Sequence, residues 1–262
     1  MDFSGIKAVV SDMDGVLWRG DTPLPGLGLF FDTLRARGLR YVLATNNSSK
    51  TQADYVRKLA QMGVTGIPET AIVTSGTATA DYLRAHYPAG TRVHVFGAEG
   101  LSAVIAAAGF TLADSDVRVV VAGLKWNLTY DDLKIASRLI MAGADFVGTN
   151  PDATYPLADG LAPGAGSMIA ALQTASGRTP VIVGKPHLPM FEAALAALQT
   201  TPAETLMVGD RLNTDIAGAA ACGLRTALVL TGIATAADIN GGIRPDAVFD
   251  GLPALVEALT TG

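Results

Sequence analysis

Asp12 and Asp14 stand two residues apart, just after the apolar run of residues 8–10 and Ser11. Side chains two apart in an extended backbone point to the same side, so both carboxylates can face one crevice. One carboxylate can attack a phosphorus atom and carry the transferred group as an aspartyl-phosphate. The second can donate a proton to the leaving group and later accept one from water, and Gly15 allows the tight turn that follows. An isolated pair is more often a solvated turn, so the motif indicates phosphoryl transfer only together with other groups.

A second acidic segment could hold a metal ion. Asp210 follows the apolar run of residues 206–208, and Asp215 lies five residues further on, in the first turn of an expected helix. Magnesium takes oxygen ligands in octahedral geometry, often one or two carboxylates with waters and substrate phosphate. Asp210 can therefore bind Mg²⁺ directly, while Asp215 can hold a metal-bound water or orient the loop. An acidic residue is also favourable by itself in the first turn of a helix, and both interpretations stay open for Asp215.

Two further segments offer donors to a phosphate group. Thr45 and Asn46 end one apolar run, and Lys185 stands between Gly184 and Pro186 after another. A hydroxyl and backbone N–H groups at the start of a helix suit a phosphate, because the first helical N–H groups point at it. Lysine is a compact positive charge that suits a phosphate oxygen. A capped turn and an exposed surface lysine are the simpler alternatives for these segments.

The elements that must position these residues follow a regular alternation. We expect strands over residues 8–10, 41–43, 71–73, 206–208 and 227–230, and helices over residues 27–37, 52–62, 189–198, 213–222 and 252–261. Continuous apolar runs are typical of strands covered by helices on both faces. The alternation therefore predicts an α/β fold with a doubly wound, Rossmann-like parallel sheet. The carboxyl ends of such strands converge on one crevice, which would bring the motifs together.

The middle of the chain has an alternation of its own. We expect strands over residues 92–97, 117–123 and 145–149, and helices over residues 101–108, 130–141 and 164–175. The motifs lie before and after this segment, which is long enough to form a small domain. We therefore expect a discontinuous catalytic core, residues 1–79 and 180–262, and a smaller α/β cap domain inserted between them, residues 80–179.

Composition excludes several classes of function. The 262 residues are 49% hydrophobic and 16% charged, which suits a large buried core and not general disorder. A net charge of −5 without a block of basic residues disfavours a nucleic-acid polymer as partner. Cys222 is the single cysteine, so no disulfide framework or cysteine metal site can form. Without a secretory signal or an apolar run long enough to span a bilayer, we expect a cytoplasmic protein with no membrane partner.

Together and in this order, the motifs make the chain similar to the haloacid dehalogenase (HAD) superfamily of phosphatases. The likeness is greatest to the NagD-like, p-nitrophenylphosphatase branch, which has a C2-type cap, and it covers nearly the whole chain. The segments that carry it are Asp12-Met13-Asp14-Gly15-Val16-Leu17-Trp18, Thr45-Asn46-Asn47, Gly148-Thr149-Asn150-Pro151-Asp152, Pro163-Gly164-Ala165-Gly166, Gly184-Lys185-Pro186 and Gly209-Asp210-Arg211-Leu212-Asn213-Thr214-Asp215-Ile216.

The resemblance implies a Mg²⁺-dependent phosphomonoesterase that acts on small phosphorylated metabolites. Asp12 would be the nucleophile and a metal ligand. Asp14 would be the acid and base, with its backbone carbonyl on the metal. Asp210 would complete the metal site, with Asp215 and Asn213 supporting it from outside. A cation is also expected on physical grounds, because clustered carboxylates beside a phosphate repel one another strongly.

The resemblance also assigns phosphate binding and specificity. Thr45 and Lys185 would bind the phosphoryl group, and Asn46 would bind it mainly through its backbone N–H. Family members with such a cap recognise the leaving group with cap residues, for which the candidates here are Asn150, Asp152 and Tyr155. For Asn150 and Asp152, a simple turn is the alternative. Trp18 could pack in the core or belong to a flap, and the resemblance favours the flap. It also suggests homo-oligomers that assemble through the cap.

Two other functions stay open at this point. A phosphomutase or phosphotransferase would keep the same chemistry and change only the acceptor. A non-catalytic phosphate-binding module would use the same donors without turnover, but Asp14 argues against it, because a simple phosphate acceptor needs no proton donor for an alcohol leaving group. The substrate is open among sugar phosphates, glycolyl or glyceryl phosphates, nucleotides and pyridoxal phosphate.

Overall fold

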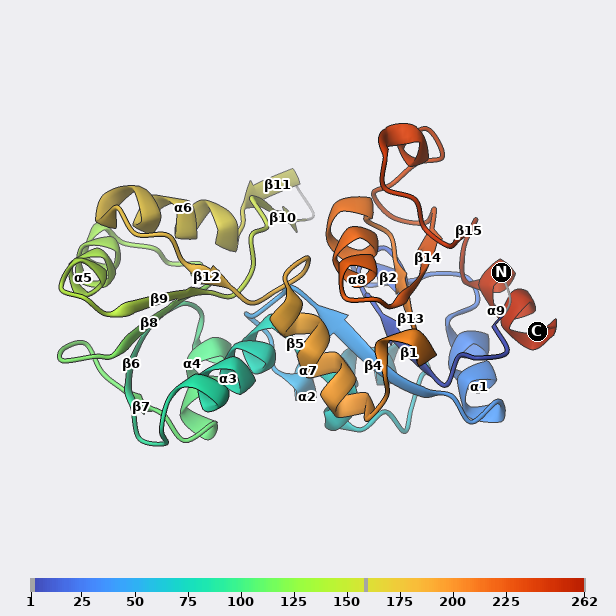
Figure 1. Ribbon diagram of the computed structural model, residues 1–262, viewed down its shortest axis with the longest axis horizontal. Helices are drawn as coiled ribbons and strands as arrows, with labels where there is room; N and C mark the ends of the chain where they lie inside the picture. The colour runs from blue at the N-terminus through green and yellow to red at the C-terminus, as the bar shows by residue number, and fades with distance from the viewer. Residues whose placement is uncertain (1–2, 158–159, 262) are drawn as a thin grey trace. The chain divides into compact units, whose positions relative to one another are not determined.

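The computed structural model describes residues 3–157 and 160–261 (Figure 1). The chain forms two compact units, each built from segments that are distant in sequence. The first unit comprises Met1–Thr45, Gln52–Val73 and Met190–Gly262, and the second comprises Asn46–Thr51 and Thr74–Pro189. Residues 46–51, 74–79 and 180–189 thus group with the second unit, although we expected them in the core. The functional division into core and cap remains a prediction.

The first unit is built on a six-stranded sheet. Its strands, in spatial order, are β15 (Ala247–Phe249), β14 (Arg225–Val229), β13 (Thr205–Gly209), β1 (Ala8–Ser11), β4 (Arg40–Thr45) and β5 (Ile72–Thr74). The neighbours from β15 to β4 pair in parallel. The chain adds β4 and β5 on one side of β1 and then β13 to β15 on the other. The strand order therefore reverses between β1 and β13, which confirms the expected doubly wound fold and marks the usual ligand position in it.

Helices α1 (Leu27–Ala36), α2 (Gln52–Gln61) and α9 (Leu252–Thr261) bury their apolar sides in one core with this sheet. Phe31 and Leu59 in these helices have no exposed surface. Burying one such side chain contributes about 1.5–3 kcal/mol. Helix α1 ends where expected, because Gly38 adopts a positive φ of 64° just after it. The same unit holds the small hairpin of β2 (Trp18–Arg19) and β3 (Thr22–Pro23).

One predicted helix has a different start. We expected a single helix over residues 213–222, but the structure has a π-helical turn, η3 (Leu212–Ile216), followed by the short helix α8 (Ala217–Ala221). The other short turns of this unit are η1 (Glu69–Ala71), η2 (Pro202–Glu204) and η4 (Asp238–Gly241). Helix α7 (Leu188–Leu198) begins in the second unit and continues into the first.

The second unit has a parallel sheet of its own. Its order is β12 (Val181–Ile182), β9 (Asp145–Gly148), β8 (Val119–Ala122), β6 (Arg92–Phe96) and β7 (Thr111–Leu112). Its helices are α3 (Ser75–His86), α4 (Glu99–Ala107), α5 (Tyr130–Met141) and α6 (Ala165–Ser176). Ile140, Ile169 and Phe146 join α5, α6 and β9 in one apolar core. The unit is thus an α/β body, and its three central strands, β9, β8 and β6, lie within the ranges expected from the sequence.

Four features of the second unit were not expected, one of which is the short edge strand β7. Strand β12, which precedes Lys185, pairs with β9 and so belongs to this sheet. Helix α3 begins at a Thr74 capping box, and β10 (Thr154–Leu157) pairs with β11 (Gly160–Pro163) in a hairpin. Across residues 3–157 and 160–261, we find no helix with the length and apolar character needed to cross a membrane.

Candidate active site

Asp12 and Asp210 leave the carboxyl ends of two adjacent strands. Strands β1 and β13 pair with Ser11 opposite Val208, and the Asp12 N–H donates to the Val208 carbonyl over 2.8 Å. Both aspartates therefore emerge at the point where the strand order reverses. In open α/β sheets, ligands bind outside the carboxyl ends of the strands at that point.

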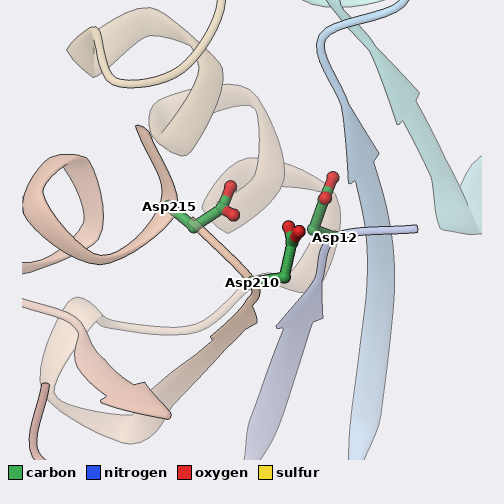
Figure 2. Close-up of side chains that lie close together, drawn as sticks. All are labelled: Asp12, Asp210 and Asp215. Carbon is green, nitrogen blue, oxygen red and sulfur yellow. The ribbon is translucent and has the colours of Figure 1, made fainter. Parts of the chain in front are cut away.

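Asp215 joins these two residues in a cluster of buried carboxylates. One carboxylate oxygen from each of Asp12, Asp210 and Asp215 lies within 4.8 Å of the others. Figure 2 shows Asp12 and Asp210 at neighbouring strand ends, with the Asp215 carboxylate directed toward them from the next turn. Asp12 is 8% exposed and the other two are 1% exposed. Two unit charges this close repel by at least about 3.5 kcal/mol at an effective dielectric constant of about 20. A cation would relieve that repulsion, and this set of hard oxygen donors fits Mg²⁺.

A loop after β14 holds Asp210 in place. The Ile233 N–H donates to Asp210 Oδ2 over 2.8 Å, and the Ala234 N–H donates to the Asp210 carbonyl over 3.0 Å. A Cβ added at Gly232 would lie 1.7 Å from Asp210 Oδ2, and one added at Gly15 would lie 2.4 Å from it. Only glycine allows both segments to come so close to this carboxylate. Sequence reasoning missed this loop, although a glycine just beyond the end of an apolar run was a signal that could have drawn attention to it.

Asp215 is held by its own turn. Its Oδ2 accepts a bond from the Arg211 N–H over 3.1 Å. Gly209 lets the turn fold back onto the strand end, because a Cβ there would lie 2.3 Å from the Asp215 Cβ. π-Helical turns occur frequently at functional sites, and this one brings Asp215 into the cluster. Asn213, in the same turn, is exposed.

Asp14 lies outside the cluster of three and is exposed. Its Oδ1 accepts a bond of 2.8 Å from the indole Nε1–H of Trp18. The Gly15 N–H donates to the Trp18 carbonyl over 2.7 Å, and the Gly15 carbonyl accepts from the Thr231 hydroxyl over 2.7 Å. Trp18 itself is completely buried and belongs to β2, so it packs in the core and also forms part of the hairpin.

The predicted phosphate-binding residues belong to both units. Thr45 is buried and is the last residue of β4. In the second unit, the Asn46 side chain binds the backbone of Lys185 at two points. Its Nδ2 donates to the Lys185 carbonyl over 3.0 Å, and its Oδ1 accepts from the Lys185 N–H over 2.8 Å. Lys185 is only 2% exposed, so the surface-lysine alternative is wrong.

The cap candidates lie in the second unit as well. Asn150 is 5% exposed and donates from Nδ2 to Asp152 Oδ2 over 2.9 Å. Tyr155, in β10, accepts a bond of 3.3 Å from Asn47 Nδ2. The Trp126 ring packs edge-on against Tyr155, with the ring centroids 5.1 Å apart. The loop that follows β4 therefore contacts the candidate specificity hairpin directly.

Known families match both ends of the chain. The family of haloacid dehalogenase-like hydrolases matches residues 9–111, and an HAD-hydrolase-like family matches residues 182–255. A glycerol-3-phosphate phosphatase of Gallus gallus is 35% identical over 289 residues, covering 98% of this chain and 93% of that protein. An acid sugar phosphatase of Staphylococcus aureus is 36% identical over 248 residues, covering 94% of this chain and 95% of that protein.

Solved structures agree with these matches. A 4-nitrophenylphosphatase from Thermotoga maritima superposes with a TM-score of 0.93 at 36% identity, covering 98% of both chains. NagD from Escherichia coli superposes with a TM-score of 0.89 at 35% identity, covering 94% of this chain and 97% of that one. A glycerol phosphate phosphatase from Mycobacterium tuberculosis, in complex with magnesium, has a TM-score of 0.89 at 34% identity, covering 97% and 77%. The chain therefore belongs to the haloacid dehalogenase-like hydrolases and is a phosphatase of their NagD-like, p-nitrophenylphosphatase branch.

Proposed function

We propose that this protein is a Mg²⁺-dependent phosphomonoesterase that hydrolyses small phosphorylated metabolites through an aspartyl-phosphate at Asp12. One observation carries the proposal. Asp12, Asp210 and Asp215 form a buried carboxylate cluster where the strand order of the parallel sheet reverses. Such a cluster is costly without a cation, and it lies where this fold binds its ligands.

The first half-reaction forms the covalent intermediate. The Asp12 carboxylate attacks the phosphorus atom, an O–P bond forms, and the bond from phosphorus to the alcohol oxygen breaks. Asp14 gives its proton to that oxygen, so the product leaves as a neutral alcohol.

The second half-reaction returns the enzyme to its starting state. Asp14, now a carboxylate, accepts a proton from the attacking water. The new bond from water oxygen to phosphorus releases inorganic phosphate and restores the Asp12 carboxylate. Both carboxyl groups end as they began.

Several residues would prepare the site for these steps. Asp12, Asp210 and the Asp14 carbonyl would hold Mg²⁺, with Asp215 and Asn213 supporting them. When bound, the ion supplies positive charge that offsets the carboxylates and the phosphate. Thr45, Asn46 and Lys185 would bind the phosphoryl oxygens.

We assign leaving-group selection to residues 80–179, as the cap. Its candidates Asn150, Asp152 and Tyr155 offer polar groups to a hydroxylated leaving group. The names of the relatives, which include a glycerol-3-phosphate phosphatase and an acid sugar phosphatase, support small polyol and sugar phosphates as the substrate class. Location in the cytoplasm and assembly of copies through the cap stay predictions from the sequence. A phosphomutase or phosphotransferase remains the alternative, distinguished by the absence of free phosphate.

The test is phosphate release from glycerol phosphates, sugar phosphates and p-nitrophenyl phosphate, with Mg²⁺ and with EDTA. We expect release that EDTA stops and added Mg²⁺ restores. Asp12→Asn should abolish release, whereas Asp32→Asn, at an exposed position of α1, should leave it unchanged. Activity that resists chelation would refute the metal assignment. Substantial release by Asp12→Asn would remove Asp12 as the nucleophile.

A further inference from the structure

Trp18 has no exposed surface, yet its one polar group meets the exposed carboxylate of Asp14. The indole Nε1–H donates to Asp14 Oδ1 over 2.8 Å. We infer that Trp18 is a positioning residue that fixes the orientation of the Asp14 carboxylate for proton transfer to the leaving group. This inference rests on the proposed function, in which Asp14 is the acid and base.

The backbone between the two residues forms a tight turn. The Met13 carbonyl accepts from the N–H of Leu17 over 2.8 Å and from the N–H of Trp18 over 3.3 Å. The Gly15 N–H donates to the Trp18 carbonyl over 2.7 Å. These bonds fold the chain back on itself, so that the Trp18 indole reaches Asp14, which lies four residues earlier in the chain.

Helix α2 holds the indole from the other side. The Tyr55 ring is stacked with it at 6.4 Å between centroids and 15° between planes. The Lys58 ammonium lies 4.7 Å from the centroid of the indole ring. The same ammonium donates a hydrogen bond of 2.6 Å to the Gly20 carbonyl. A cation over an indole face is attracted to it and draws electron density from the ring, which makes the N–H a stronger donor. The indole is therefore fixed in place and polarised toward Asp14.

The chemistry of indole gives this contact its direction. Indole has one N–H donor and no acceptor, so it can bind only a lone pair of the carboxylate. Bound in this way, Asp14 Oδ1 is held, and Oδ2 is the oxygen that carries the proton to the leaving group. An exposed carboxylate turns readily about its last bond. Trp18 removes that freedom, and correct orientation is a large part of the efficiency of proton transfer.

The experiment compares two leaving groups in the Mg²⁺-loaded enzyme. Trp18→Phe keeps an aromatic ring and removes only the N–H donor and part of the ring area. The quantity to measure is kcat/KM, which reports events up to release of the alcohol. Glycerol 3-phosphate needs a proton on its leaving oxygen, whereas p-nitrophenolate leaves without one. We expect kcat/KM for glycerol 3-phosphate to fall roughly 10- to 100-fold and that for p-nitrophenyl phosphate to fall by less than about threefold.

A control separates orientation from lost packing. Phe31→Leu replaces another fully buried aromatic side chain of the same core with a smaller one. It should change kcat/KM by the same factor for both substrates. Equal losses for both substrates in Trp18→Phe would overturn the inference and leave the proposed function standing. Wild-type protein that releases no phosphate from any substrate with Mg²⁺ would overturn both.

A second measurement does not depend on turnover. The chain has two tryptophans, so the ¹⁵N–¹H spectrum of the folded protein has two indole signals, which Trp126→Phe assigns. We expect Asp14→Ala to move the Trp18 indole signal upfield and to leave the Trp126 signal in place. A Trp18 signal that does not respond to Asp14→Ala would show that the bond is absent in solution, and the inference would fail.

Discussion

Replacing Gly232 with alanine should disable the metal site although no acidic residue is substituted. The added Cβ would lie 1.7 Å from Asp210 Oδ2 and 2.3 Å from its Cγ. Interiors are close-packed, so either the carboxylate or the loop must shift by more than about 1.5 Å. Magnesium tolerates little departure from ligand distances of about 2.0–2.1 Å. The displaced Asp210 oxygen would therefore no longer lie where it can bind the ion.

The size of the effect follows from the contacts of Asp210. The same shift breaks the bond from the Ile233 N–H to Asp210 Oδ2. A hydrogen bond to a charged group is worth about 1.5–3 kcal/mol, which corresponds to about a 10- to 100-fold higher Mg²⁺ concentration at half-maximal activity. Misplacement by about 1 Å can also cost about 100-fold in rate, so kcat at saturating Mg²⁺ should fall by a similar factor.

The assay is phosphate release over a range of Mg²⁺ concentrations, with thermal unfolding measured with and without Mg²⁺. Gly28→Ala is the matched control, because it makes the same substitution in helix α1, where a Cβ would meet nothing within 4 Å. It should stabilise the protein by about 0.5–1 kcal/mol and leave Mg²⁺ dependence unchanged. If Gly232→Ala keeps a half-saturating Mg²⁺ concentration within about twofold of the wild-type value, the placement of Asp210 against this loop is refuted.

Three further expectations follow from the structure. Asp215→Asn should keep the fold and raise the half-saturating Mg²⁺ concentration about tenfold, because one charge leaves the cluster; a substituted enzyme with unaltered Mg²⁺ dependence would place Asp215 outside the metal site. Tyr155→Ala should change the ranking of kcat/KM among phosphate esters more than it changes the rate with p-nitrophenyl phosphate, and a uniform loss across all esters would contradict its role in selection. Burial, and next a hydrogen bond to Asp145, raise the pKa of Tyr87 from 10.0 to about 12. Tyr87 therefore loses its proton at a lower pH in the unfolded protein than in the folded one, and the free energy of unfolding should fall as pH rises from 10.0 toward 12. Urea unfolding should show a smaller decrease in the free energy of unfolding from pH 9 to pH 11 for Tyr87→Phe than for the wild type. Equal decreases in the two proteins would contradict the raised pKa.

Local sequence patterns were enough to predict much of the secondary structure of the first unit. Strand β1 and helix α1 were expected because their apolar spacing is strong over a short stretch of chain. The positions of Asp12 and Asp210 followed from the same patterns, since a residue that ends a parallel strand must lie at the carboxyl edge of the sheet.

What could not be predicted depends on contacts between residues far apart in the chain. Ile233 binds a carboxylate 23 positions away, and Asn46 binds the backbone of Lys185 across 139 positions. No local pattern encodes either contact. Helix α3 was missed for another reason: Gly76, Thr77 and Thr79 lower its intrinsic helix propensity, and burial together with the Thr74 capping box offsets this.

The strand order also determines when the protein can become an enzyme during its synthesis. Strand β1 leaves the ribosome first, but its partner β13 begins only at Thr205. Until then, the apolar edge formed by Ala8, Val9 and Val10 has β4 on one side and no β13 on the other. Unpaired apolar strand edges promote aggregation. We therefore expect a nascent chain shorter than about 200 residues to be both inactive and prone to aggregate, since Asp12 meets Asp210 only when the gap beside β1 closes.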